Sequence, residues 1–114
     1  MRFLITGDVF LEEVIGEAVT IDAIPGESFA VHQPHLSAYE LDPLWVVTHV
    51  ETGMRVGGGE SAAAALAAAR NNCAERTPEE IAQALASARQ RRALANATKP
   101  MRPATKRNPN SVLG

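Results

Sequence analysis

The stretch from Leu44 to Cys73 constrains the fold of this chain most strongly, because it joins a strand pattern, three consecutive glycines and an alanine-rich segment. Residues 44–50 place β-branched and aromatic side chains alternately on two faces, which is typical of a β-strand. Gly53 allows the positive φ that a short hairpin turn requires, and residues 54–56 return as a partner strand. We therefore predict a β-hairpin at this point.

An alanine-rich helix should follow that hairpin. Residues 57–59 are all glycine and should end the second strand, since consecutive glycines lack both strand propensity and side chains that pack. Ser61 is a favourable N-cap, and alanine, which dominates the next segment, is the strongest helix former. Its small side chains should let the helix approach the sheet closely. The predicted stripe on one face consists of Ala62, Leu66, Ala69 and Cys73.

The N-terminal segment allows two interpretations. Residues 2–6 form a short apolar run that predicts a first strand. Residues 8–15 could form a helical turn capped by Asp8, or residues 3–11 could be the first strand of a hairpin that returns through residues 17–23. We predict the helical turn, followed by a strand over residues 18–23.

Less regular segments lead from there to the central unit. Residues 24–27 contain a Pro-Gly pair and predict a turn, and residues 29–32 predict a brief strand. Residues 33–43 hold two prolines and show no clear periodicity, which indicates a loop or an irregular edge.

The clearest helix start in the chain follows the alanine-rich segment. Thr77 is the predicted N-cap, Pro78 suits the first helical position, and Glu80 completes a capping box. We expect this helix to end near residues 96–98. Its predicted buried face consists of Ile81, Leu85 and Ala88.

Length and composition fit one domain of the α+β class. With 114 residues the chain can build a single modest core. We predict a small antiparallel sheet packed on one face by two helices over residues 1–97. Residues 98–114 contain three prolines and four basic residues but little that could be buried, so we predict a disordered basic tail there.

The expected location of the chain is the cytoplasm. Its one cysteine cannot form an internal disulfide, which agrees with a reducing compartment. Acidic residues occur too early for a secretory signal. Since no apolar run reaches the length that a membrane span needs, we expect no membrane contact.

The net charge of −2 hides a marked division along the chain. Residues 1–60 carry two basic and ten acidic side chains, whereas residues 61–114 carry nine basic and three acidic side chains. Such asymmetry favours an electrostatic partner for one of the two halves. Equally, the halves could face each other, or the basic tail could simply be solvated.

Three histidines raise the question of a metal site. His32, His35 and His49 could supply nitrogen ligands, with an oxygen ligand from Glu40 or Asp42. A loop and a strand edge seldom hold such ligands without further cysteines or histidines nearby. We therefore predict neither a metal nor another cofactor.

Other motifs also lack a catalytic pattern. The glycines at 57–59 precede a helix, but no lysine follows them and Glu60 sits where an anion would bind, so they match neither the P-loop nor the dinucleotide fingerprint. Cys73 lies on an apolar helix stripe, where buried thiols are usually inert. Carboxylates such as Glu12 and Glu13 form no recognisable acid/base pair. We predict that the protein is not an enzyme.

The strands followed by GMRVGGGESAAAALAAA resemble, over roughly residues 28–73, the β-β-β-α half of the double-stranded-RNA-binding domain. They are also similar to the partial version of that module in HicB-type antitoxins. The RNA-binding family implies lysines at the start of the helix for phosphate contact, but residues 62–65 are all alanine here. The C-terminus likewise lacks the DNA-binding helix-turn-helix that the HicB-type comparison implies.

The general composition is similar to that of accessory proteins encoded by phages and plasmids, the anti-CRISPR proteins among them. Some of these bind a host machine and block its nucleic-acid site. The resemblance therefore implies a small inhibitor rather than an enzyme.

The first functional hypothesis is a non-catalytic protein-binding module, such as an inhibitor or modulator of a host nucleic-acid-handling complex. Its acidic surface would contact a basic partner protein and set specificity and encounter rate. Trp45 would add an interaction anchor if its strand face is exposed, and would belong to the core if that face is covered. The predicted partner-binding residues are Glu12, Glu13, Glu17, Asp22, Glu40, Asp42, Trp45 and Glu51.

The alternative hypothesis is a nucleic-acid-binding accessory protein that uses the basic final helix and tail. Its side chains would contact phosphates and release counterions. No aromatic residues are interleaved with them, so stacking on bases is not indicated. The residues concerned are Arg89, Arg91, Arg92, Lys99, Arg102, Lys106 and Arg107.

Overall fold

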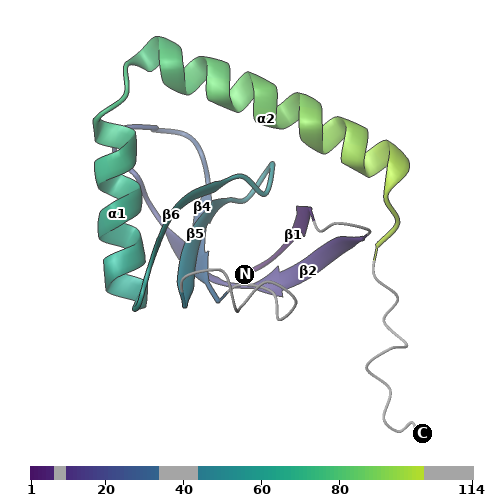
Figure 1. Ribbon diagram of the computed structural model, residues 1–114, viewed down its shortest axis with the longest axis horizontal. Coiled ribbons are helices and arrows are strands. Elements are labelled where there is room, and N and C mark those ends of the chain that lie inside the picture. Colours follow the sequence, from purple (N-terminus) through teal and green to yellow (C-terminus); the bar gives the residue numbers. More distant parts are fainter. Residues whose placement is uncertain (7–9, 34–43, 102–114) are drawn as a thin grey trace, which may run out of the picture.

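The computed structural model describes residues 1–6, 10–33 and 44–101 and confirms an α+β fold. The described strands are β1 (Arg2–Thr6), β2 (Leu11–Ile15), β3 (Glu17–Val19), β4 (Phe29–His32), β5 (Trp45–His49) and β6 (Arg55–Gly59). The helices are α1 (Ala62–Ala74) and α2 (Pro78–Thr98). Figure 1 shows α1 beside β6, and α2 running across the end of the sheet and on above β1 and β2.

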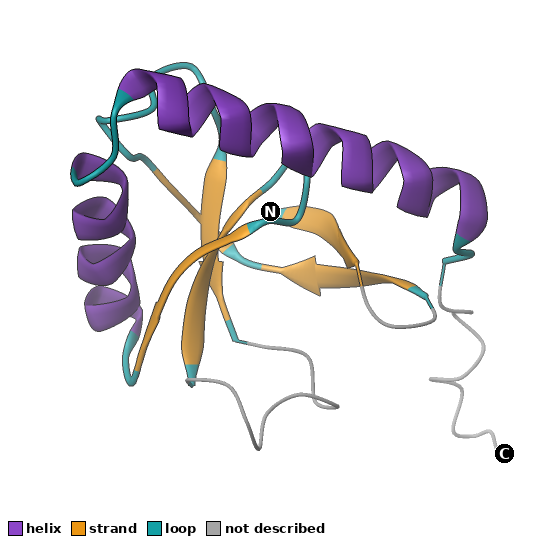
Figure 2. Ribbon diagram, turned by 45° about the horizontal axis from the view of Figure 1, so that its top comes forward, coloured by secondary structure: helices purple, strands orange, loops and turns teal. Residues whose placement is uncertain are grey.

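The strands form two antiparallel sheets (Figure 2). Strands β3, β4, β5 and β6 pair in sequence order, with Val31 opposite Val47 in the central pair. The predicted hairpin is confirmed as β5 and β6, and Gly53 in its turn has a φ of 77°. Strands β1 and β2 form a separate two-stranded sheet.

The predicted helical turn over residues 8–15 is wrong, because residues 11–15 form strand β2. This segment pairs along its whole length with β1, so that Phe3 lies opposite Val14 and Thr6 opposite Leu11. Pairing with the preceding strand has overridden the helical pattern of the segment itself. The strand predicted over residues 18–23 is also shorter and earlier, as β3, and Asp22 lies in the turn that follows it.

The three glycines at 57–59 do not end the second strand as predicted but form its last three residues, paired with β5. They permit the close helix packing that the alanines predicted. A Cβ atom on Gly57 would lie only 2.5 Å from the backbone nitrogen of Ala69, and one on Gly59 would lie 2.8 Å from the Cβ of Ala64. The Ser61 hydroxyl accepts a hydrogen bond from the backbone N–H of Ala64 at 3.1 Å and confirms the predicted N-cap. Glycine therefore serves here to bring a helix onto a strand.

Side chains from the larger sheet and from both helices form one apolar core. Phe29, Val31 and Val47 point into it from the strands, Ala69 comes from α1 and Leu85 from α2. Trp45 is half-buried against this core. Its indole therefore packs at the edge of the core.

The capping box at the start of α2 is confirmed. The backbone N–H of Thr77 donates to the Glu80 carboxylate at 2.9 Å, and the Thr77 hydroxyl accepts from the N–H of Glu80 at 3.1 Å. After α2 the N–H of Leu11 donates to the Pro100 carbonyl at 2.8 Å, and Met101 forms a bridge with Leu11. Pro100 and Met101 thus contact the start of β2. The rest of the predicted tail, residues 102–114, lies outside the described residues, and the domain boundary at residue 97 stays a prediction.

Within the described parts of the chain, neither helix combines the length and the apolar character that crossing a membrane would require.

Candidate functional site

The buried imidazole of His49 is the centre of a polar cluster at the end of β5. Its Nε2 lies 2.7 Å from Oε1 of Glu27, and its Nδ1 lies 2.7 Å from the hydroxyl of Thr52. That hydroxyl oxygen accepts a hydrogen bond from the backbone N–H of Met54 at 3.2 Å, so its own proton is free to be donated to Nδ1. These contacts assign the proton of a neutral His49 to Nε2, where it is donated to Glu27.

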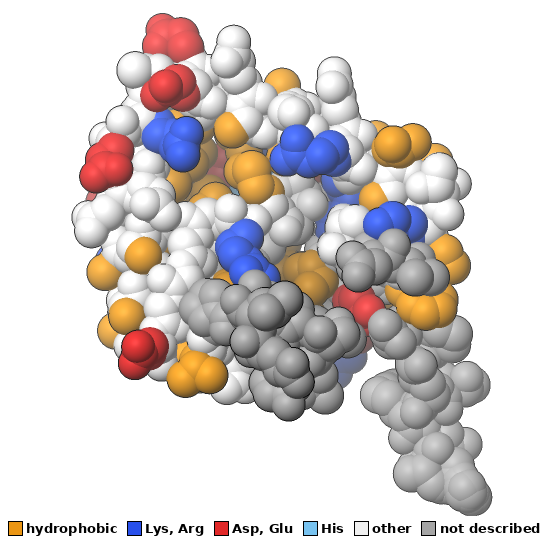
Figure 3. Space-filling view, viewed as in Figure 1, with side chains coloured by type: hydrophobic (Ala, Val, Ile, Leu, Met, Phe, Trp, Pro, Cys, Tyr) orange, Lys and Arg blue, Asp and Glu red, His pale blue; other side chains and the backbone are white. Residues whose placement is uncertain are grey.

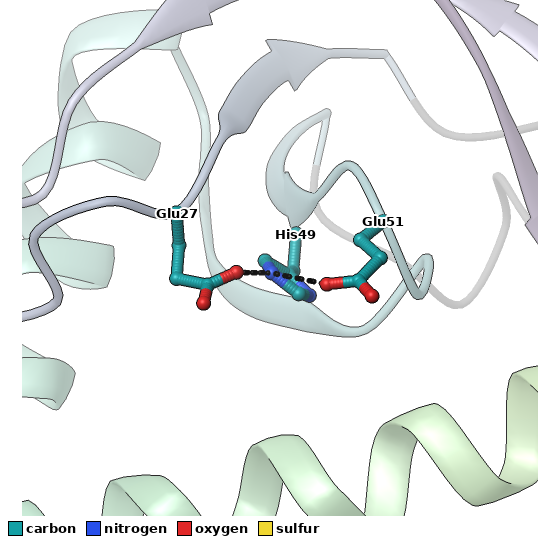
Figure 4. A group of neighbouring side chains, drawn as sticks. All are labelled: Glu27, His49 and Glu51. Atoms are coloured by element: carbon teal, nitrogen blue, oxygen red, sulfur yellow. Dashed lines mark hydrogen bonds and ion pairs between the residues drawn. The ribbon is translucent and has the colours of Figure 1, made fainter.

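Arg89 of α2 closes the cluster from the outside. Its guanidinium donates to Glu27 at 3.0 Å and to Glu51 at 2.8 Å. Figure 4 shows both carboxylates directed toward the imidazole from the two sides. The hydrogen bond from His49, followed by that from Arg89, lowers the pKa of Glu27, and the Arg89 hydrogen bond lowers the pKa of Glu51.

Glu27, His49 and Glu51 are also the residues that could hold a divalent metal, since one ligand atom from each lies within 4.8 Å of the others. The Arg89 guanidinium already supplies positive charge to both carboxylates. The cluster joins the start of β4, the β5–β6 turn and α2 through hydrogen bonds. We therefore assign it a structural role and name it the His49 clamp (Glu27, His49, Glu51, Thr52 and Arg89).

Among the described residues, His32 does not belong to the group that His49 forms with Glu27 and Glu51. His32 is buried; its Nδ1 donates to the Gln33 carbonyl at 2.8 Å and its Nε2 lies 2.8 Å from the Thr48 hydroxyl. Burial lowers the pKa of His32, which favours the neutral ring. His35, together with Glu40 and Asp42, lies outside the described residues.

Two of the predicted partner-binding carboxylates do not form a free acidic surface. Glu12 is only 5% exposed, so its expected place on that surface is wrong. The Glu51 carboxylate is exposed at its edge but is bound to Arg89. The contact of Glu51 with Arg89 joins residues far apart in the sequence, so no local pattern reveals it. Glu13, Glu17 and Asp22 are exposed, as the hypothesis requires.

An exposed strip runs along the chain where β2 passes into β3. The side chains of Glu13, Ile15 and Glu17 are exposed, whereas the residues between them are at least half-buried. Ile15 is 68% exposed, more than any other large hydrophobic side chain among the described residues. We call Glu13, Ile15 and Glu17 the acidic strip. The alternation of acid and apolar residues could have revealed it, had this segment been interpreted as a strand.

The basic residues of α2 are also partly used within the fold. Arg89 belongs to the clamp. Arg92 is only 8% exposed and donates to the backbone carbonyls of Glu51 and Leu4, so its predicted place on an exposed basic surface is wrong. Arg91 is exposed and donates to the Ser87 hydroxyl at 3.0 Å, and Lys99 is half-buried. The remaining residues of that set lie outside the described parts, namely Arg102, Lys106 and Arg107.

An apolar pocket of about 330 Å³ opens between α1, β6 and α2. Figure 3 shows hydrophobic side chains between basic ones on this face. Cys73 lines the pocket, and burial raises the pKa of its thiol. A raised pKa disfavours the reactive thiolate, which supports the packing role that the sequence indicated.

Comparison of this chain with protein-family models, with curated proteins and with solved structures gives no match. The likeness to the double-stranded-RNA-binding and HicB-type modules therefore stays a prediction.

Proposed function

We propose that this protein is a non-catalytic protein-binding module whose acidic strip contacts a basic surface on a partner protein. The observation that carries the proposal is the 68% exposure of Ile15 between the exposed Glu13 and Glu17. An apolar side chain that is buried on association supplies binding energy. The flanking carboxylates select a basic surface and speed the encounter.

The backbone of the strip is fixed before any partner arrives. Strand β2 pairs with β1, and the N–H of Gly16 donates to the Met1 carbonyl at 2.9 Å. A Cβ on Gly16 would lie 2.9 Å from the Val31 carbonyl oxygen, so the chain passes close to β4 at this point. A rigid strip loses little conformational entropy on binding, which favours affinity.

The charges of the strip are largely available to a partner. Among the described residues, Glu13 forms an ion pair with Arg2 at 3.7 Å, with side chains that are 49% and 70% exposed. Exposed pairs of this kind contribute little and exchange readily for a better partner. Basic surfaces are typical of proteins that bind nucleic acid, so we propose a nucleic-acid-handling protein as the partner, with this module as its inhibitor or modulator.

The alternative, a nucleic-acid-binding accessory protein, has less support in the described part of the chain. Arg89 is held by two carboxylates, and Arg92 lies inside the fold. Arg91 and Lys99 remain as described basic residues at the end of α2. Direct nucleic-acid binding would therefore depend mainly on the tail.

The proposal is tested by charge reversal of the strip. The double variant Glu13→Lys, Glu17→Lys should lose at least about tenfold of partner binding, because it places like charges against a basic surface. The control Glu60→Lys, Glu75→Lys makes the same charge change at two exposed sites elsewhere. Capture from lysate, identification by mass spectrometry and titration of the purified partner give the readout. Equal binding by both variants, or equal loss, would refute the proposal.

A further inference from the structure

A second, smaller pocket of about 150 Å³ lies between the end of β1, the β5–β6 turn and α2. Its wall includes two arginines and two threonines, and no acidic side chain contributes to it among the described residues. The lining includes Thr6, Thr52, Gly53, Arg91 and Arg92. The His49 clamp, which contains two carboxylates, lies at a neighbouring part of the same turn, so the two sites differ in charge.

Arg92 carries a buried charge that no described carboxylate neutralises. It is 8% exposed, and within the described parts of the chain its terminal nitrogens donate to the backbone carbonyls of Glu51 and Leu4. Its buried Nε has no hydrogen-bond partner among the described residues. Burial lowers the pKa of Arg92, as expected of a cation removed from water without a counter-charge. Buried arginines are normally paired with an anion.

The turn beside this guanidinium is built without a side chain. Gly53 has a φ of 77°, and a Cβ at this position would lie 3.2 Å from a terminal nitrogen of Arg92 and 3.3 Å from the Cα of Ile5. Gly53 thus leaves the pocket wall beside the Arg92 guanidinium without a side chain. On the other side, the Ser87 hydroxyl holds the guanidinium of Arg91, which leaves further N–H groups of this fork for an acceptor.

We infer that this pocket binds a small oxyanion, a phosphate or carboxylate group, between Arg91 and Arg92. Planar guanidinium groups match the geometry of both anions. The Thr6 hydroxyl, which also lines the pocket, offers a further donor, whereas that of Thr52 is used by the clamp. The bound anion supplies the counter-charge that Arg92 lacks among the described residues. The inference is independent of the acidic strip.

Nuclear magnetic resonance of the arginine side chains tests this site in the full chain. Inorganic phosphate is titrated at constant ionic strength, with sodium acetate as a parallel arm, while the Nε–Hε signal of Arg92 is followed. The signal should shift and saturate. Arg91→Gln should weaken the binding about tenfold through loss of charge-assisted hydrogen bonds, and this exposed substitution leaves Arg92 in place. The control Arg76→Gln, at an exposed residue of the larger pocket, should leave the affinity unchanged.

Saturation by acetate with the same dependence on Arg91 would support the site with a carboxylate as its ligand. A shift that does not saturate, or the same affinity in Arg91→Gln and the native chain, would overturn the inference. Asp8 follows the pocket residue Thr6 by two positions in the sequence. Binding that appears only in the variant Asp8→Asn would assign the counter-charge to the chain itself and would overturn the inference as well.

Discussion

Glutamates serve two different purposes in two regions of this molecule. In the His49 clamp, Glu27 and Glu51 face an arginine that lies far away in the sequence and that fixes them at 3.0 and 2.8 Å. In the acidic strip, Glu13 of β2 and Glu17 of β3 are exposed on either side of an exposed isoleucine. The same residue type therefore braces the fold in one region and remains available for contact in the other.

Only part of the charge division along the chain is therefore available to a partner. Part of the negative N-terminal half is neutralised by the positive C-terminal half across the β5–β6 turn, as Arg89 shows. Carboxylates that are paired in this way contribute to folding and to the placement of α2. Only the carboxylates left outside such contacts can set the specificity of an interaction.

The largest effect should come from the centre of the clamp. His49→Ala removes the hydrogen bonds to Glu27 and Thr52 and leaves a cavity beside Phe29, whose ring centroid lies 5.3 Å from the imidazole. We expect a loss of about 2–4 kcal/mol in the free energy of unfolding. Urea denaturation followed by circular dichroism measures it. A stability equal to that of the native chain would show that the clamp does not stabilise the fold.

A smaller effect should appear in the pH dependence of stability. The hydrogen bonds from His49 and Arg89 lower the pKa of Glu27 in the folded state below its ordinary value of 4.5. The stability that Glu27 contributes is therefore complete above pH 4.5 and is lost as the pH falls through the lowered folded-state pKa. Glu27→Gln should be less stable than the native chain at pH 7, and the difference should shrink in acid. Denaturation curves between pH 7 and pH 3 test this sign, and a difference that grows in acid would reverse it.

The smallest effect on stability should come from the acidic strip. Ile15→Ala removes an exposed side chain with few packing partners, so we expect a change within about 0.5 kcal/mol. Partner binding should nevertheless fall, because the apolar anchor is lost. Paired measurements of unfolding and binding separate the two. A large loss of stability would show that Ile15 belongs to the fold rather than to a contact surface.

The elements with strong local signals could be predicted from the sequence. Ser61, the pair Thr77 and Glu80, and Gly53 determine helix starts and a turn through their own backbone and nearest neighbours. Strand β2 could not be predicted in this way, because its conformation depends on pairing with β1 rather than on its own pattern. The acidic strip was missed for the same reason.

The contacts of Arg89 and Arg92 in α2 show a second limit of prediction from the sequence. Arg89 meets Glu27 and Glu51 only after the chain has folded, and no spacing along the sequence announces that contact. Arg92, in contrast, falls on the helical stripe that continues from Leu85 and Ala88 to Ala95. That periodicity could have identified it as a buried cation.

Site-specific crosslinking tests the central claim most directly. A photoreactive amino acid is placed at Ile15, and in a matched control at Leu94, which is 65% exposed on α2. Ultraviolet irradiation in lysate should link the Ile15 position to a defined protein, and the adduct should disappear when Glu13 and Glu17 are changed to lysine. Equal labelling of the same protein from both positions, or no protein adduct at Ile15, would contradict the assignment of the acidic strip as the contact surface.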